Sequence, residues 1–204
     1  GNYVIDLKVR GSLQATELSP FIKSWLTSLL DWAYLYAQFS GWSDIAIGFA
    51  LLMGVKIAEN FNNPLKATNL IEFWQRWHIS LSTWCKDYIF VPVVSITRNP
   101  FIAVTAAMLV MGAWHELSLY YVLWGCYHAL GIASCRLFQA QYHSFRLIQN
   151  NSPIPSMPDL NWVNKKNNLL NLIGKLCGWC LTFIFIVSAA PVINYVLEWI
   201  RHYV

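Results

Sequence analysis

The stretch "EFWQRWHISLSTWCKDY", Glu72 to Tyr88, decides how this chain is interpreted. On a helical wheel, at about 100° per residue, its apolar side chains share one face and its charged side chains share the other, with Ile79 as the single exception. The apolar face contains Ile71, Phe73, Trp74, Trp77, His78, Leu81, Trp84, Cys85 and Tyr88. A segment divided in this way is typical of a helix that lies along a membrane interface with its tryptophans inward. We therefore expect one amphipathic helix from about Leu70 to Phe90.

The composition of the whole chain indicates a membrane protein. Of its 204 residues, 56% are hydrophobic and 12% are charged, whereas a soluble domain carries about 25% charged residues. The net charge of +4 is scattered along the sequence, so no basic patch indicates nucleic-acid binding. A large soluble helical protein with an apolar core is the alternative class.

Three apolar blocks, residues 21–55, 101–135 and 169–200, surround the central segment. The first could form two short helices or one long broken helix. The second is too long for one upright ~20-residue span, and a turn near Gly112 would lie below the membrane surface. Residues 139–168 are polar and contain three prolines, which predicts an extramembrane loop. The predicted fold is an all-α integral membrane protein with several transmembrane and re-entrant helices and one amphipathic interfacial helix.

Two histidines are candidates for chemistry. His115 and Glu116 interrupt an apolar block, and ionisable groups at membrane depth are costly enough to mark a function. A neutral imidazole avoids that cost and still accepts a proton near neutral pH. His78 lies at the edge of the apolar face, where an interfacial anchor is the alternative role, and His128 is expected to serve helix packing. Because no H-x-x-x-H or H-E-x-x-H spacing occurs, we expect no metal site.

Three segments resemble the membrane-bound O-acyltransferase family. They are "FSGWSDIAIGFALLMG", "ENFNNPLKATNLIEFWQRWHISLSTWCKDYIFVPV" and "MGAWHELSLYYVLWGCYHALG", which occur in the family's order over about residues 38–131. The most similar branch is the bacterial one, with alginate O-acetyltransferases and D-alanyl transferases of teichoic acid. Members of the family are longer, so residues 1–204 are expected to be the C-terminal portion of a polytopic acyltransferase domain.

The resemblance implies roles for particular residues. The family's essential histidine lies in a W-H-G segment, which corresponds to residues 114–116, and a second histidine lies in R-W-H, residues 76–78. His115 is therefore expected to act as general base, and His78 to position the acyl donor or polarise its carbonyl. The resemblance also implies a tunnel or funnel through the membrane, and the residues expected to line it are Trp74, Trp77, Trp84 and Trp114. The residues expected to bind substrate are Trp74, Arg76, Trp77, Ser82 and Trp114.

The implied reaction transfers an acyl group, expected to be acetyl, from a thioester to a hydroxyl of an exported or cell-envelope polysaccharide. No bound cofactor is expected. Acetyl-CoA or an acyl-carrier protein would supply the acyl group from the cytoplasmic side of a bacterial inner membrane that the protein crosses several times. Membrane lipid, a periplasmic partner protein and the glycan acceptor are the other expected partners.

The distribution of basic residues predicts which side of the membrane each segment faces, and two alternative functions remain open. Lysines and arginines cluster in residues 56–98 and 136–175, and both clusters lie on the cytoplasmic side if residues 101–135 form a hairpin. One alternative is a transporter or channel subunit, in which Asp31 and Asp44 would help to relay protons. The other is a catalytically inactive scaffold, because Glu116 stands where the family has glycine.

Overall fold

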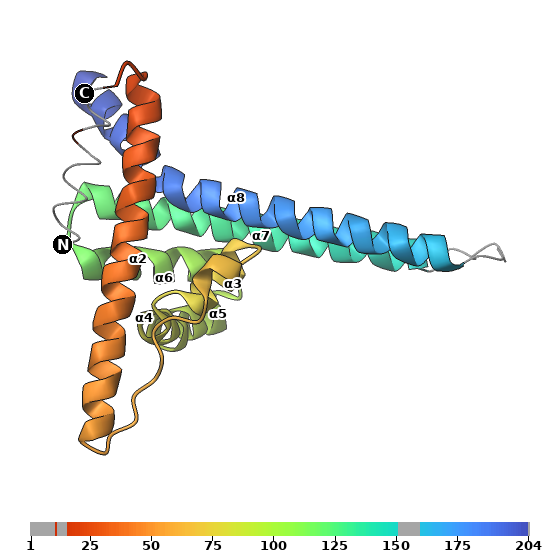
Figure 1. The fold of residues 1–204 in the computed structure, drawn as a ribbon, viewed down its shortest axis with the longest axis horizontal. Helices are drawn as coiled ribbons and strands as arrows, with labels where there is room; N and C mark the ends of the chain where they lie inside the picture. Colours follow the sequence, from red (N-terminus) through yellow and green to blue (C-terminus); the bar gives the residue numbers. More distant parts are fainter. Residues whose placement is uncertain (1–10, 12–15, 151–159, 204) are drawn as a thin grey trace. The chain divides into compact units, whose positions relative to one another are not determined.

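The computed structural model describes residues 11, 16–150 and 160–203, and within these ranges helices form and no strand does. Figure 1 shows these helices in the order of the sequence. The chain divides into two compact units. One unit contains residues 1–58 and 185–204, and the other contains residues 59–184. The all-helical expectation is therefore confirmed for the part of the chain that the structure describes.

The first unit is built on α2, a helix of 33 residues, Pro20–Leu52. Ser19 caps its start by accepting a hydrogen bond from the Ile22 backbone N–H at 3.4 Å, and Pro20 occupies the first turn, where its missing N–H costs nothing. The sequence left open a break near residue 41, but the helix is continuous. A lone glycine weakens a helix by about 1 kcal/mol without ending it, and no proline follows Pro20 within the helix.

The C-terminal part of α8 (Leu160–Tyr203) belongs to the same unit and contains a proline. Pro191 has no backbone N–H, so it cannot donate to the carbonyl of Val187 four residues before it. The Ser28 hydroxyl of α2 donates to that carbonyl at 2.6 Å instead, in a buried contact. A serine on one helix thus satisfies the acceptor that the proline leaves open on the other.

The second unit contains the segment that was expected to be one helix over residues 70–90, and this expectation is wrong. The structure has α3 (Leu70–Arg76), a break at residues 77–78, and a second helical stretch from residue 79 onward. Residues 60–62 lie against the break. The Asn62 backbone N–H donates to the Arg76 carbonyl, and the Ile79 N–H donates to the Asn60 carbonyl, both at 2.9 Å. These bonds satisfy backbone groups that the interrupted helix would leave unpaired.

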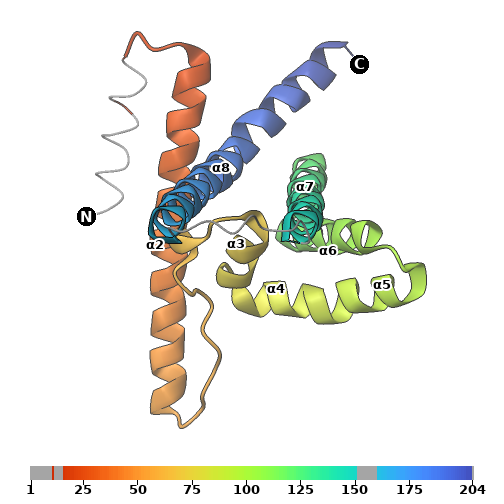
Figure 2. The ribbon, with the colours of Figure 1, turned by 90° about the vertical axis from the view of Figure 1, so that its right-hand side faces the viewer.

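Beyond the break, the chain runs as one rod formed by α4 (Ile79–Cys85), the π-helical turn η2 (Lys86–Phe90) and α5 (Val91–Thr97) (Figure 2). The break changes which side chains face inward, because residues on either side of it no longer share one helical phase. Trp84 is 47% exposed and Tyr88 is 67% exposed, although the continuous wheel placed both on the inner face.

The apolar block 101–135 forms a helical hairpin of α6 (Pro100–His115) and α7 (Leu119–Asn150). The turn occupies residues 116–118, one helical turn later than the expected position near Gly112. A Cβ atom at Gly112 would overlap the Tyr121 carbonyl, and one at Gly125 would lie 2.7 Å from the Met108 carbonyl oxygen. Both glycines therefore allow the two backbones to approach closely.

The structure bears on the expected loop at residues 139–168 and on the number of membrane spans. Much of the expected loop 139–168 is helical, because α7 continues to Asn150 and α8 begins at Leu160. The three prolines lie within 151–159, outside the described residues. Within the described part, one helix is long and apolar enough to cross a membrane, at Asn171–Tyr203 in α8. The shorter apolar helix α6 does not reach that length, so several spans stay a prediction.

Candidate active site

His78 lies at the break between α3 and α4 and has the left-handed backbone conformation φ 46°, ψ 54°. Its ring is buried, and its Nδ1 atom lies 3.2 Å from Oδ1 of Asn60. The same oxygen accepts hydrogen bonds from the Ser80 backbone N–H at 3.3 Å and the Ser80 hydroxyl at 2.9 Å. Because a backbone N–H can only donate, the Asn60 atom is the acceptor, and Nδ1 of His78 must carry the proton.

The protonation of His78 limits what it can do. Burial, helped by the charge of His115, lowers the pKa of His78 to about 4, so the ring is neutral at pH 7. With the proton on Nδ1, Nε2 of the neutral ring accepts hydrogen bonds and cannot donate one. This tautomer suits positioning a substrate by accepting a hydrogen bond, whereas polarising a donor carbonyl needs the proton on Nε2; both roles stay predictions.

One indole lies between the two candidate histidines. The rings of His78 and Trp114 meet edge to face with centroids 5.6 Å apart, and those of Trp114 and His115 meet with centroids 5.0 Å apart. His115 is the last residue of α6, and the residue is exposed, as is Trp114 before it. The R-W-H and W-H-E segments, remote in sequence, thus come together, with one histidine buried and the other accessible.

The first turns of α7 supply rings that sequence reasoning did not assign to the site. Tyr121 stacks on His115 at 5.2 Å with an interplanar angle of 16°, and Trp124 meets the same imidazole edge-on at 5.6 Å. Trp124 also lies 4.5 Å from His128, which is buried. Their spacing, i, i+3 and i+7, is that of one helix face, so periodicity would have grouped them.

The tryptophans expected to bind substrate occupy different places. Trp74 joins the cluster through Trp124, at 5.7 Å, and through His128, at 5.2 Å. The Trp77 ring stacks on the Phe73 ring with centroids 5.5 Å apart. The Trp77 backbone carbonyl accepts a hydrogen bond from the Ser82 hydroxyl at 3.0 Å. Trp74 and Ser82 also line a mostly apolar pocket of about 280 Å³.

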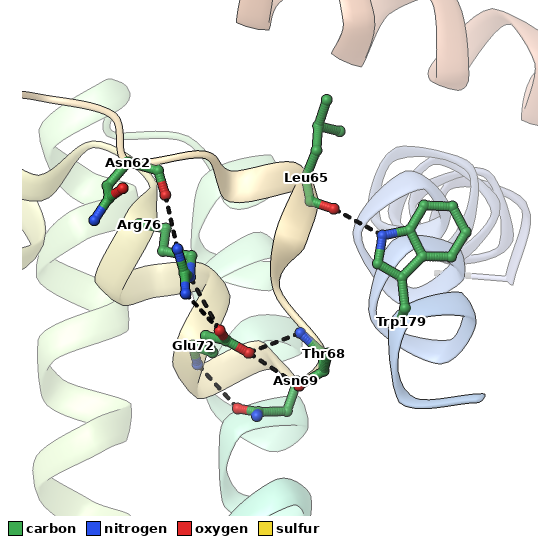
Figure 3. A network of polar contacts seen from close by, with 7 residues as sticks. All are labelled: Asn62, Leu65, Thr68, Asn69, Glu72, Arg76 and Trp179. Atoms are coloured by element: carbon green, nitrogen blue, oxygen red, sulfur yellow. Dashed lines mark hydrogen bonds and ion pairs between the residues drawn. The ribbon is translucent and has the colours of Figure 1, made fainter. Parts of the chain in front are cut away.

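Arg76 is engaged in holding the break together (Figure 3). Its guanidinium donates to one Glu72 oxygen from Nη2 at 2.7 Å and from Nε at 3.1 Å, and to the Asn62 carbonyl at 3.1 Å. The other Glu72 oxygen accepts from the Thr68 backbone N–H at 2.8 Å and from its hydroxyl. The Thr68 backbone bond, aided by Arg76, lowers the pKa of Glu72 despite the opposing effect of burial. Arg76 thus positions the loop against His78, and its contact with substrate stays a prediction.

The same loop is tied to α8. The Trp179 indole N–H donates to the Leu65 carbonyl at 2.7 Å, as Figure 3 shows, and Gly178 allows the backbone at Thr68 to approach α8. The loop that carries Asn60 is therefore fixed by α3 on one side and by α8 on the other.

Glu116 follows directly on the site as the C-terminal cap of α6, with an exposed side chain. Its backbone N–H donates to the Gly112 carbonyl at 3.3 Å. In the ranges that the structure covers, no group of three His, Cys, Asp or Glu side chains is arranged to hold a metal ion.

Comparison with known sequences identifies the lineage of this site. A profile described as the membrane-bound O-acyltransferase family matches residues 3–164. The chain belongs to the membrane-bound O-acyltransferase family. It is therefore a membrane protein, as its composition predicted.

Individual members of the family are similar over parts of their length. A probable alginate O-acetylase, AlgI, of Pseudomonas syringae is 34% identical over 169 residues, which cover 78% of this chain and 32% of the relative. A peptidoglycan O-acetyltransferase of Helicobacter pylori is 33% identical over 176 residues, 85% of this chain and 29% of the relative. A teichoic acid D-alanyltransferase of Bacillus subtilis is 34% identical over 128 residues, which cover 58% of this chain and 32% of the relative. The chain spans about a third of the length of these relatives.

Proposed function

We propose that this chain carries the histidine site of a membrane O-acyltransferase that moves an acyl group from a thioester to a hydroxyl of an exported or cell-envelope polysaccharide. The observation that carries the proposal is the placement of His78 and His115 on two sides of Trp114. The relatives' names favour this class of acceptor, since they specify alginate, peptidoglycan and teichoic acid. Two of those names specify O-acetyl transfer, which favours acetyl as the group transferred.

In the proposed reaction, the acceptor hydroxyl oxygen attacks the thioester carbonyl carbon. A C–O bond forms, the C–S bond breaks, and the hydroxyl proton passes to His115 and from there to the departing thiolate. His115 suits this role because its side chain is accessible, and the contacts with the Tyr121 and Trp124 rings fix the orientation of its imidazole.

His78 has a different role in this proposal. Its Nε2 atom accepts a hydrogen bond from the acceptor hydroxyl or from an amide N–H of the donor, and so orients that group toward His115. Its ring is buried while that of His115 is exposed, which favours His115 as the base that meets the acceptor hydroxyl. Trp114, between the two rings, would form the floor on which the reacting groups meet.

The hairpin supports a topology for the reaction. If the α6–α7 hairpin enters the membrane from one side and returns to it, the basic residues before and after it share that side, and the positive-inside rule would make it cytoplasmic. The 16 residues of α6 rise about 24 Å, less than a ~30 Å hydrocarbon core. His115 would then lie deep in a bacterial inner membrane. Acetyl-CoA or an acyl-carrier protein would approach from the cytoplasm, and the glycan with a periplasmic partner from the opposite side.

The proposal is tested by acyl transfer in membranes. Membranes containing the protein would be given a thioester with a radiolabelled acetyl group and candidate envelope glycans, and label on the glycan would be counted. His115→Ala should abolish transfer while leaving the melting temperature of the purified protein unchanged. His202→Ala, a histidine exposed at the end of α8, is the matched control and should transfer normally. Normal transfer by His115→Ala would refute the assignment.

A further inference from the structure

A pocket of about 280 Å³ lies between α3, α4, η2, α6 and α7, and its position suggests a ligand beyond the reactants. Most of its lining is apolar, contributed chiefly by Ile71, Val104, Ala107, Met108, Met111 and Ile132. Two cations, Lys86 and Arg136, also line it. An apolar interior bordered by two positive charges matches an amphiphile that carries a negative headgroup.

Of the two cations, Arg136 is the one whose side chain is held in place. Its guanidinium lies over the Phe90 ring, 5.2 Å from the centroid, and the side chain is half-buried. Within the described residues it makes no ion pair or hydrogen bond. A planar fork of donors held in this way matches the oxygens of a phosphate, which Arg binds in bidentate fashion. Lys86 supplies a second positive charge, partly offset by the Asp87 carboxylate 3.7 Å from its Nζ.

The interior of the pocket determines which phosphate compound fits. At roughly 30 Å³ per water-sized group, it holds on the order of ten methylene groups. A pantetheine arm would bring two amides into this space. The neutral polar groups that line it are those of Gln75 and Ser82, the Cys85 thiol and the indole N–H of Trp74. The indole can only donate, and the Ser82 hydroxyl already donates to Trp77, so the pocket offers few acceptors for the two amide N–H groups. A hydrocarbon chain needs no such partners.

We propose that this pocket binds an anionic phospholipid, with one acyl chain between α3, α6 and α7 and the phosphate on Arg136 and Lys86. The residues that follow Phe90 and Arg136 in sequence agree with contact to lipid, since Val91, Leu137 and Phe138 are 44%, 52% and 69% exposed. Family membership places the chain in a membrane, which supplies the ligand. The bound lipid packs on Trp74 and so supports the ring cluster of the candidate site from behind.

The test is lipid binding to the full protein in neutral detergent, followed by native mass spectrometry with equal amounts of phosphatidylglycerol and phosphatidylcholine. The wild-type protein should retain the anionic lipid about tenfold over the zwitterionic lipid. The double variant Lys86→Gln/Arg136→Gln should lose that preference. Lys56→Gln/Lys66→Gln, which removes two exposed charges that do not line the pocket, should keep it. His115→Ala should also keep it, which separates lipid binding from the proposed catalysis.

Three results would overturn the proposal. Equal retention of the two lipids by the wild-type protein would show that the cations select no headgroup. An unchanged preference in Lys86→Gln/Arg136→Gln would place the lipid elsewhere. Displacement of phosphatidylglycerol by an equal concentration of 4′-phosphopantetheine would assign the pocket to the thioester donor. A filling variant, Ala107→Phe, gives an independent measure, since it should weaken retention of both lipids without a change of charge.

Discussion

At the scale of single residues, His78 combines a strained backbone with a fixed ring. A left-handed conformation costs most residues about 1–2 kcal/mol, and the φ of 46° at this position is stabilised by the loop that Asn60 anchors. The same hydrogen bond that holds the ring puts the proton on Nδ1 and turns Nε2 into an acceptor. Backbone strain and the proposed chemistry therefore depend on one asparagine.

Two substitutions at this position separate folding from function. His78→Asn keeps a donor near the place of Nδ1, and asparagine tolerates left-handed backbone, so the melting temperature should change little. Transfer should fall at least about tenfold, the value of one hydrogen bond of about 1.4 kcal/mol. His78→Ala should lose about 1 kcal/mol of stability as well, because it removes the Nδ1–H donor to Asn60 and replaces it with nothing. Thermal unfolding and transfer assays on both variants check this, and a fully active His78→Asn would exclude a role for Nε2.

At the scale of helices, glycines determine how closely α6 and α7 pack. A methyl group at Gly125 would lie 2.7 Å from the Met108 carbonyl oxygen and 3.1 Å from the Leu109 Cα. Backbone atoms cannot move aside as a flexible side chain can, and small residues are the usual means by which membrane helices approach each other. The contact lies in the middle of α6, about two turns before His115, and one turn after Tyr121, which stacks on His115.

Gly125→Ala should therefore destabilise the hairpin by about 1–3 kcal/mol, the usual cost of overpacking. The control is Gly41→Ala in α2, where a Cβ meets nothing within 4 Å. There alanine should stabilise the helix by about 0.5–1 kcal/mol, because it restricts the unfolded chain. Thermal unfolding in detergent measures both effects. Equal behaviour of the two variants would mean that the backbones are not in contact.

The pairing of Ser28 with Pro191 also operates between helices and gives a double-mutant test. Ser28→Ala should cost about 1–3 kcal/mol, because the buried Val187 carbonyl loses its donor. Pro191→Ala restores a backbone N–H that can donate to the same carbonyl. In that background, removal of the serine hydroxyl should cost much less. If unfolding free energies of the two changes simply add, the serine does not serve the carbonyl that the proline leaves open.

At the scale of the whole molecule, composition and motifs predicted the class and the family but not the local geometry. The charge deficit and the apolar blocks were sufficient for a helical membrane protein. The break at His78 was missed because apolar spacing is the same whether or not one residue leaves the helix. Asn60 was missed because its partner lies 18 positions away across a turn. The spacing of apolar residues predicts which face of a helix is buried. A break in the helix depends instead on contacts between segments that are distant in sequence.

The central claim is that His78 and His115 serve one reaction in one site, and a kinetic double-mutant cycle tests it most directly. The kcat/KM for acyl transfer would be measured for the wild-type protein, His78→Asn, His115→Ala and the double variant. His115→Ala should lower it by on the order of 10²–10⁴-fold, the usual contribution of a general base. Because His78 orients a group for that base, adding His78→Asn to His115→Ala should lower it little further. Independent losses that multiply in the double variant, or transfer that survives without His115, would contradict the account.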